Sequence, residues 1–191
     1  SKSIVRKALE VAKGLGADTI LVVPGVVSAP FASGERTSYA KAWERSLSGL
    51  RELAPLAQEA GIYIGVENVW NKFLLSPIEM RDFVDSVGSD YVGVYFDVGN
   101  VLLYGFPEDW IRILGNRIKK VHFKDYRTAV GTIAGFVNLL EGDVNWPEVM
   151  AALGEIGYTD YAYTELSPYK HNGDQLIYDI SNAMDRILGR T

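Results

Sequence analysis

Residues 92–100 read Val-Gly-Val-Tyr-Phe-Asp-Val-Gly-Asn, a short apolar run that ends directly before a carboxylate. The run from Val92 to Phe96 is rich in β-branched and aromatic residues and has the length of a strand buried on both faces. Asp97 then places a charged group where the strand ends. The same arrangement recurs along the chain, and it predicts both the fold and the chemistry.

Four further apolar runs resemble the first, and helical patterns separate them. The runs cover residues 19–23, 62–66, 118–123 and 161–166. Apolar spacing typical of amphipathic helices is found in residues 4–15, 43–57, 107–114 and 176–188, and helix-capping sequences begin at Ser76 and Asn145. Strands that alternate with helices are joined by right-handed crossovers, so we expect a parallel sheet.

A barrel explains this α/β pattern better than a nucleotide-binding open sheet. No Gly-x-Gly-x-x-Gly follows the first strand, and no Gly-x-x-x-x-Gly-Lys is present. A complete parallel (β/α) barrel has eight units in about 250 residues, whereas this chain offers five strands. We therefore expect residues 1–191 to form one partial barrel domain, which lacks roughly three amino-terminal βα units.

Composition narrows the class of function. The net charge of -5 is spread over a mixed sequence without a basic run, which argues against a nucleic-acid partner. No stretch has the apolar length of a membrane span, and the absence of cysteine excludes disulfides and thiolate metal sites. We expect a cytoplasmic protein that acts on a small molecule.

Four of the five predicted strands end in a polar side chain that can bind a metal. These side chains are Glu67, Asp97, His122 and Glu165. A single carboxylate after a strand is more often a helix cap or a solvated loop residue, but four such placements are a systematic feature. The carboxyl ends of barrel strands form one face, so we expect the four side chains to converge there. Three carboxylates and one imidazole suit one divalent ion, with Mn²⁺ first and Mg²⁺, Co²⁺ or Zn²⁺ as alternatives.

These motifs resemble the xylose isomerase-like TIM barrels of the sugar phosphate isomerase/epimerase family. The resemblance runs from residue 8 to residue 188 and is nearest to the ketose 3-epimerase and L-ribulose-5-phosphate 3-epimerase, hexulose-6-phosphate isomerase-like, group. It implies that the five strands correspond to strands 4–8 of the family barrel. It is carried by Glu67-Asn68, Phe96-Asp97-Val98-Gly99-Asn100, His122-Phe123-Lys124-Asp125, residues 140–146 and Thr164-Glu165.

The resemblance also implies roles for the four residues. All four are expected to be metal ligands, and Glu67 and Glu165 are expected to form the catalytic pair. A metal on O2 and O3 of a ketose polarises the carbonyl and acidifies the C3 hydrogen. One glutamate then removes that proton and the other returns one on the opposite face, through a cis-enediolate. The same groups acting between C1 and C2 give an aldose-ketose isomerase.

Five further residues are candidates for binding a sugar or sugar phosphate. Asn100 and Arg127 match, the latter within one position, family residues that contact substrate. Lys124 can bind a phosphate or pair with Asp125. Trp70 follows Glu67 closely and can form an apolar wall, and His171 lies in the loop after the last strand, where an exposed histidine is the simpler interpretation.

One departure from the family pattern bears on the substrate. Ketose 3-epimerases of free sugars commonly carry a glutamate six residues after the first ligand, where this chain has Phe73. The hydrogen bonds around the substrate must therefore differ from theirs.

Three other functions remain open. An endonuclease IV-like phosphodiesterase shares the barrel but needs a histidine-rich site, and this chain has two histidines. An inosose dehydratase-like lyase would use the same metal and carboxylates. A non-catalytic fragment would keep the metal site without a closed pocket. Because a partial barrel leaves strand edges unpaired, we also expect a homo-oligomer or another chain that completes it.

Overall fold

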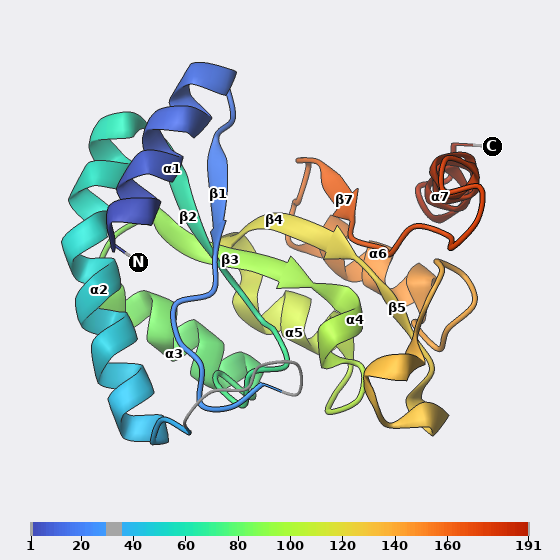
Figure 1. Ribbon diagram of the computed structural model, residues 1–191, viewed down its shortest axis with the longest axis horizontal. Helices are drawn as coiled ribbons and strands as arrows, with labels where there is room; N and C mark the ends of the chain where they lie inside the picture. Colours follow the sequence, from blue (N-terminus) through green and yellow to red (C-terminus); the bar gives the residue numbers. More distant parts are fainter. Residues whose placement is uncertain (1, 30–35, 191) are drawn as a thin grey trace. The chain divides into compact units, whose positions relative to one another are not determined.

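The computed structural model describes residues 2–29 and 36–190 as helices and strands in alternation (Figure 1). The longer helices are α1 (Lys2–Leu15), α2 (Tyr39–Ala60), α3 (Pro77–Val87), α5 (Pro107–Leu114), α6 (Trp146–Glu155) and α7 (Gln175–Ile187). The strands of the main sheet are β1 (Thr19–Val22), β2 (Tyr63–Glu67), β3 (Val92–Asp97), β4 (Ile118–Phe123) and β7 (Ala162–Thr164), in the order β1-β2-β3-β4-β7. The expected α/β class with parallel strands is confirmed.

The chain divides into two compact units. The first comprises Ser1–Phe96 with Ile113–Lys120, and the second comprises Asp97–Arg112 with Val121–Thr191. Strand β4 therefore begins in the first unit and ends in the second. The single domain expected for residues 1–191 stays a prediction.

The first unit holds β1, β2 and β3 in parallel register, with α1 and α2 packed against each other (Figure 1). Its core contains an aromatic cluster: the Phe73 ring centroid lies 5.6 Å from that of Phe83 and 6.4 Å from that of Trp43. Edge-to-face pairs of this kind add to the free energy gained by burying the rings. The cluster anchors the loop that follows β2, because Phe73 belongs to that loop and is only 2% exposed.

The second unit pairs the end of β4 with β7 and adds elements that the apolar pattern does not reveal. These are the short helix α4 (Val98–Val101), the antiparallel pair β5 (Asp125–Tyr126) and β6 (Phe136–Val137), and the 3-10 turns η2 (Thr128–Val130) and η3 (Ile133–Gly135). A third 3-10 turn, η1 (Gly115–Arg117), precedes β4 in the first unit. Strands of two residues are too short to show a period in the sequence.

The predicted helix starts are confirmed. The Ser76 hydroxyl accepts a hydrogen bond from the Glu79 amide at 3.2 Å, and the Asn145 side chain accepts one from the Glu148 amide at 3.4 Å. Strand ends agree with the prediction to within one residue, except that β7 covers only residues 162–164. In the part of the chain that the structure describes, no helix has both the length and the apolar character needed to cross a membrane.

Candidate metal centre

The second unit brings together three of the four predicted ligands. Asp97 ends β3 and is fully buried, His122 lies in β4, and Glu165 follows β7 directly. Each offers a ligand atom, and these atoms lie within 4.8 Å of one another. The Asp97 carboxylate is oriented by α4, because its Oδ1 accepts a hydrogen bond from the Asn100 amide at 2.9 Å.

The register of β4 and β7 explains why Glu165 meets this group. His122 lies opposite Tyr163, and Phe123 lies opposite Thr164. The next residues in that register are Lys124 and Glu165, so they leave neighbouring strands side by side. His122 lies within β4, and Lys124 is the first residue beyond that strand.

Lys124 lies between two of the predicted ligands. Its Nζ is 2.7 Å from Glu165 Oε2 and 3.0 Å from Asp97 Oδ2. Burial by itself lowers the pKa of this ammonium, but the Asp97 charge and the Glu165 hydrogen bond outweigh burial and raise it above its usual value. The Lys124 hydrogen bond in turn lowers the pKa of Glu165 against the opposing effect of partial burial. The group is therefore a compact site that attracts positive charge.

The donor set fits a divalent cation. Two carboxylates and an imidazole supply hard oxygen atoms and one nitrogen, which is the ligand chemistry of Mn²⁺, Mg²⁺ and Zn²⁺ sites. Asp97 is 0% exposed and its charge is already balanced by a cation, the Lys124 ammonium, at hydrogen-bonding distance. A divalent ion would satisfy the same requirement at the same oxygens.

Glu67 belongs to the first unit. It is the last residue of β2, is 7% exposed, and lies opposite Tyr95 in the parallel pairing of β2 with β3. Its position at the carboxyl end of a buried strand agrees with the sequence-based prediction. Its role as a ligand and as a catalytic group stays a prediction.

Asp125 is a buried carboxylate whose role the sequence did not reveal. It accepts hydrogen bonds from the Tyr126, Leu140 and Val144 amides at 2.9–3.2 Å and from Trp146 Nε1 at 3.2 Å. The sequence suggested Asp125 as a partner for Lys124, but the lysine forms its ion pairs with Asp97 and Glu165. Asp125 instead fixes the segment from Leu140 to Trp146 beside the end of β4.

Two glycines of the sequence motifs permit close approaches in this unit. A Cβ on Gly99 would lie 2.7 Å from the Lys124 carbonyl oxygen, and a Cβ on Gly142 would lie 2.1 Å from Asp125 Oδ1. Both distances are shorter than any ordinary contact. The Asp-Val-Gly-Asn and Leu-Glu-Gly-Asp motifs therefore pack directly on the His-Phe-Lys-Asp motif, and this is the physical reason for their glycines.

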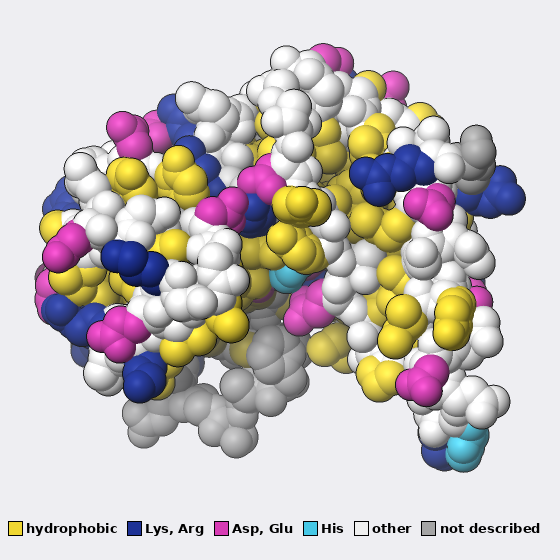
Figure 2. Space-filling view, turned by 90° about the horizontal axis from the view of Figure 1, so that it is seen from above, with side chains coloured by type: hydrophobic (Ala, Val, Ile, Leu, Met, Phe, Trp, Pro, Cys, Tyr) yellow, Lys and Arg dark blue, Asp and Glu magenta, His cyan; other side chains and the backbone are white. Residues whose placement is uncertain are grey.

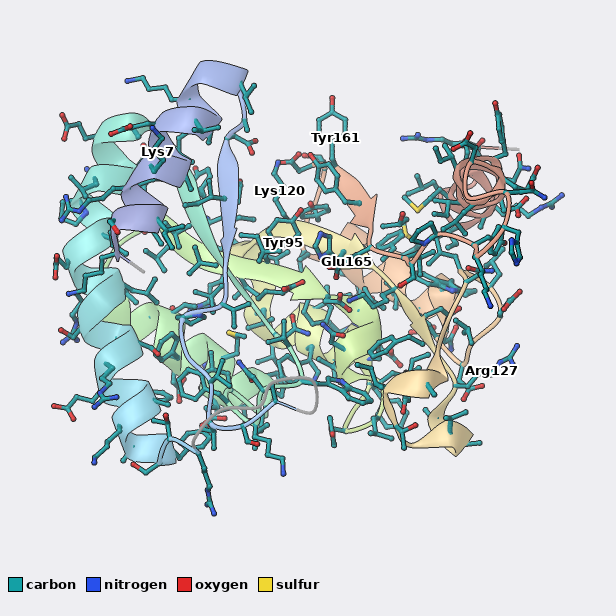
Figure 3. All side chains as sticks on the ribbon, in the orientation of Figure 1. Lys7, Tyr95, Lys120, Arg127, Tyr161 and Glu165 are labelled. Atoms are coloured by element: carbon teal, nitrogen blue, oxygen red, sulfur yellow. The ribbon has the colours of Figure 1, made fainter. Side chains whose placement is uncertain are left out.

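Two of the candidate substrate residues in the second unit, Asn100 and Arg127, lie at different places. Asn100 is 8% exposed in α4, one turn beyond Asp97. Arg127 is exposed, donates a hydrogen bond from Nε to the Glu141 carbonyl at 2.9 Å, and lies on the outer side of its loop, apart from Glu165 (Figure 3). In this conformation Arg127 does not join the cluster.

Trp70, Phe73 and His171 were also considered in the sequence analysis. Trp70 is half-buried in the loop after β2 of the first unit, and Phe73 in the same loop is core. His171 is exposed in the segment between β7 and α7, and the metal-capable cluster found among residues 2–29 and 36–190 does not include it. The exposed-histidine interpretation of His171 agrees with this placement.

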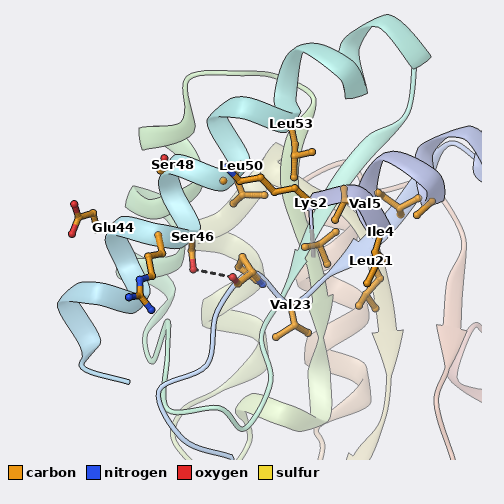
Figure 4. A pocket seen from close by; sticks show the side chains of 16 residues that line it. Lys2, Ile4, Val5, Leu21, Val23, Glu44, Ser46, Ser48, Leu50 and Leu53 are labelled. Atoms are coloured by element: carbon orange, nitrogen blue, oxygen red, sulfur yellow. Dashed lines mark hydrogen bonds between the residues drawn. The ribbon is translucent and has the colours of Figure 1, made fainter. Parts of the chain in front are cut away.

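A cavity of about 780 Å³ lies in the first unit between α1, β1 and α2 (Figure 4). Apolar side chains dominate its lining, among them Ile4, Val5, Leu21 and Leu53. At its polar end the Ser46 hydroxyl donates to the Pro24 carbonyl at 3.0 Å. None of the proposed metal or substrate residues lines this cavity.

The surface carries no concentrated basic region on the face drawn in Figure 2, where lysine and arginine side chains are scattered among acidic and hydrophobic ones. This agrees with the net charge of -5.

Three curated proteins are similar to the chain over part of their length. An uncharacterized protein of Methanocaldococcus jannaschii is 28% identical over 160 residues, covering 81% of this chain and 52% of that protein. D-psicose 3-epimerase of Enterocloster bolteae is 29% identical over 147 residues, covering 75% of this chain and 46% of that protein. Inosose dehydratase of Lacticaseibacillus casei is 27% identical over 140 residues, covering 64% of this chain and 46% of that protein. The chain thus spans about half the length of the curated relatives it matches.

A solved structure gives the same fold. The IolI protein, in a crystal structure with a bound zinc atom, superposes with a TM-score of 0.77 at 20% identity, covering 98% of this chain and 69% of that one. Identity at this level establishes the fold alone. The family model described as "Xylose isomerase-like TIM barrel" matches residues 1–185. The chain therefore belongs to the xylose isomerase-like TIM-barrel family.

Proposed function

We propose that the protein is a metal-dependent isomerase or epimerase of a ketose or ketose phosphate, in which Glu67 and Glu165 transfer the proton. The observation that carries the proposal is the cluster of Asp97, His122 and Glu165 in the second unit. Family membership and the similarity to a D-psicose 3-epimerase support it.

Strand register supports Glu67 as the fourth ligand. Glu67 lies opposite Tyr95, and Asp97 is two residues beyond Tyr95 on β3. Side chains two residues apart on a strand share a face, and residues directly opposite on neighbouring strands do so as well. Glu67 and Asp97 are therefore expected to point to the same face of the sheet at its carboxyl end.

Each of the four side chains has a role in the proposed proton transfer. A divalent ion would act as a Lewis acid on the ketose carbonyl, and Mn²⁺ is the ion we expect. One glutamate removes the proton on the carbon beside the carbonyl, and the other delivers a proton to the opposite face of the cis-enediolate. His122 and Asp97 would hold the ion, and the full burial of Asp97 keeps water away from that carboxylate.

The substrate contacts follow from the same arrangement. Asn100 and Lys124 adjoin Asp97 and are proposed to hydrogen-bond substrate oxygens or a phosphate. Trp70 is proposed as an apolar wall. Arg127 and His171 are exposed, so contact with substrate would require their loops to close over it.

Proton exchange in deuterated water tests the proposal directly. Incubation of the protein and Mn²⁺ with ketoses and ketose phosphates should place deuterium at C3 for an epimerase, or at C1 or C2 for an aldose-ketose isomerase, as read by NMR. Glu67→Gln and Glu165→Gln should each reduce the labelling rate by at least about a hundredfold, the lower range for loss of an acid or base group.

Glu59→Gln is the matched control, because Glu59 is exposed on α2 and changes the net charge equally. Wild-type labelling rates in Glu67→Gln and Glu165→Gln would show that the acid/base pair is wrong. Labelling that persists in full after metal is removed would refute the metal-dependent mechanism.

A dehydratase of an inosose is the second candidate, and the similarity to inosose dehydratase of Lacticaseibacillus casei favours it. It would use the same carboxylates to remove a proton beside a carbonyl and then expel a hydroxyl from the next carbon. Mass spectrometry separates the two outcomes. A lyase gives a product lighter by one water, whereas an epimerase gives a product of unchanged mass.

Two further alternatives have less support. An endonuclease IV-like phosphodiesterase would need more imidazole ligands than the two histidines of this chain allow. A non-catalytic fragment would bind Mn²⁺ but leave every ketose unlabelled in the exchange experiment. The cytoplasmic location expected from composition stays a prediction.

Association through strand β1 is also proposed. Within the described residues β1 pairs only with β2, so its other edge is unpaired, and Leu21 on this strand is 40% exposed. Val23, just beyond the strand, is 39% exposed, and the apolar cavity lies beside both (Figure 4). An unpaired edge with apolar side chains favours pairing with a second copy or with another chain that extends the sheet.

A further inference from the structure

Lys124 is more than a neighbour of the proposed metal ligands. Its ammonium lies 3.0 Å from Asp97 Oδ2 and 2.7 Å from Glu165 Oε2, and its side chain is 13% exposed. It therefore holds a single positive charge between the two carboxylates that a divalent ion would bind. About an eighth of the side chain's surface is therefore open to water, so the lysine is not fully enclosed in the core.

We propose that Lys124 is an internal competitor of the divalent ion, which neutralises Asp97 and Glu165 in the metal-free protein and is displaced from them when metal binds. The inference rests on the proposed metal site. It concerns what this lysine does to metal affinity and to the stability of the metal-free state.

The ammonium and a divalent ion would compete for the same two carboxylate oxygens. A metal ion needs carboxylate oxygens at about 2.0–2.4 Å, and it would take the same two oxygens that now lie beside the Lys124 ammonium. An ammonium left in place would lie within about 4 Å of a divalent ion, where repulsion is strong in a partly dry site. The lysine must therefore move, and metal binding includes the loss of its hydrogen bond to Glu165 and of its ion pair with Asp97.

A neighbouring aromatic ring offers the displaced ammonium an alternative position. Its four-carbon stem is flexible, and Nζ already lies 5.3 Å from the centroid of the Phe136 ring. An ammonium released from the carboxylates can stay over that ring face and meet an anionic or hydroxyl group of the substrate. Metal loading would then also make Lys124 available for the substrate contact proposed above.

Calorimetric titration with Mn²⁺ tests the inference with Lys124→Gln, Lys124→Arg and the control Lys170→Gln, whose lysine is exposed. Lys124→Gln should bind Mn²⁺ at least about tenfold more tightly than wild type, because no ammonium competes. Lys124→Arg keeps the charge and should stay within about threefold of wild type, as should Lys170→Gln.

Thermal melting supplies a second readout. In EDTA, Lys124→Gln should melt below wild type because two carboxylates lose their cation, and Mn²⁺ should raise its melting temperature more than that of wild type. A lysine with a purely structural role would give a loss that Mn²⁺ does not reverse.

A third measurement is made on the wild-type protein, and a variant is needed only to assign one resonance. Reductive methylation with ¹³C keeps lysine charges, and the Lys124 resonance is identified by its absence in Lys124→Arg. On addition of Mg²⁺ that resonance should shift while the Lys170 resonance stays in place.

The outcomes separate the two proposals. Equal or weaker Mn²⁺ binding by Lys124→Gln, or an unchanged Lys124 resonance in a protein that binds metal, would overturn the competitor role and leave the metal site standing. Failure of both wild type and Lys124→Gln to bind Mn²⁺ would overturn the metal site and the inference together.

Discussion

At the scale of single residues, Asp125 shows how a buried carboxylate can organise a site without touching substrate. Its two oxygens accept from three backbone amides and one indole nitrogen, and the residue is 0% exposed. These bonds connect the end of β4 to residues 140–146. The bonded groups hold the backbone beside Lys124, so the position of that lysine depends on Asp125.

Asp125→Ala should lower the free energy of unfolding by about 3 kcal/mol or more, because it leaves four buried donors without their acceptor. Urea unfolding followed by fluorescence measures this. Asp174→Asn is the control, because Asp174 is exposed at the start of α7 and makes no side-chain cap. A difference below 1 kcal/mol between the two variants would contradict the role given to Asp125.

The residues that could be predicted from sequence are those whose position follows from strand order. Asp97, His122 and Glu165 each end a recognisable apolar strand, and parallel strands bring their carboxyl ends to one edge. Lys124 and Asp125 were visible as residues, but their partners were not. The partners of Lys124 are Asp97 at the end of β3 and Glu165 just after β7, and those of Asp125 lie mainly in residues 140–146. No local pattern specifies such distant pairings.

At the scale of elements, α4 and β5 pack against each other through a glycine. Gly99 lies on α4, where a side chain would collide with the backbone of Lys124. Neither element was predicted, because α4 has four residues and β5 has two. The Asp-Val-Gly-Asn motif was visible in the sequence, yet only the packing gives its glycine a physical reason.

Gly99→Ala should destabilise the protein by about 2 kcal/mol through overpacking and weaken Mn²⁺ binding by displacing Lys124 and Asp97. Gly154→Ala is the matched control. Its Cβ would meet nothing within 4 Å on α6, so it should be neutral or stabilise slightly. Thermal melting and Mn²⁺ titration measure both effects, and equal behaviour of the two variants would show that the close approach at Gly99 has no such consequence.

At the scale of the whole molecule, the chain spans about half of its curated relatives, and β1 offers an unpaired edge among the described residues. The relevant apolar surface is that of Leu21 and Val23 beside the cavity of the first unit. The fold class could be predicted from the alternation of strands and helices along the chain. It could not supply what covers this edge, because a pairing partner outside the chain leaves no pattern within it.

Sedimentation velocity over a range of protein concentrations should therefore show self-association, and Leu21→Lys should shift the equilibrium toward monomer by placing a charge on the edge. Ile78→Lys is the control, since Ile78 is exposed on α3 away from β1. A wild-type monomer at all concentrations with a single cooperative melting transition would contradict the proposed association.

The central claim is that Asp97, His122, Glu165 and Glu67 bind one divalent ion. Anomalous diffraction at the manganese edge from crystals grown with Mn²⁺ tests it most directly. The account predicts one strong peak about 2.2 Å from a ligand atom of each of the four side chains, with Lys124 moved away from Asp97 and Glu165. A crystal with no peak at these residues, or with its peak bound elsewhere, would contradict it.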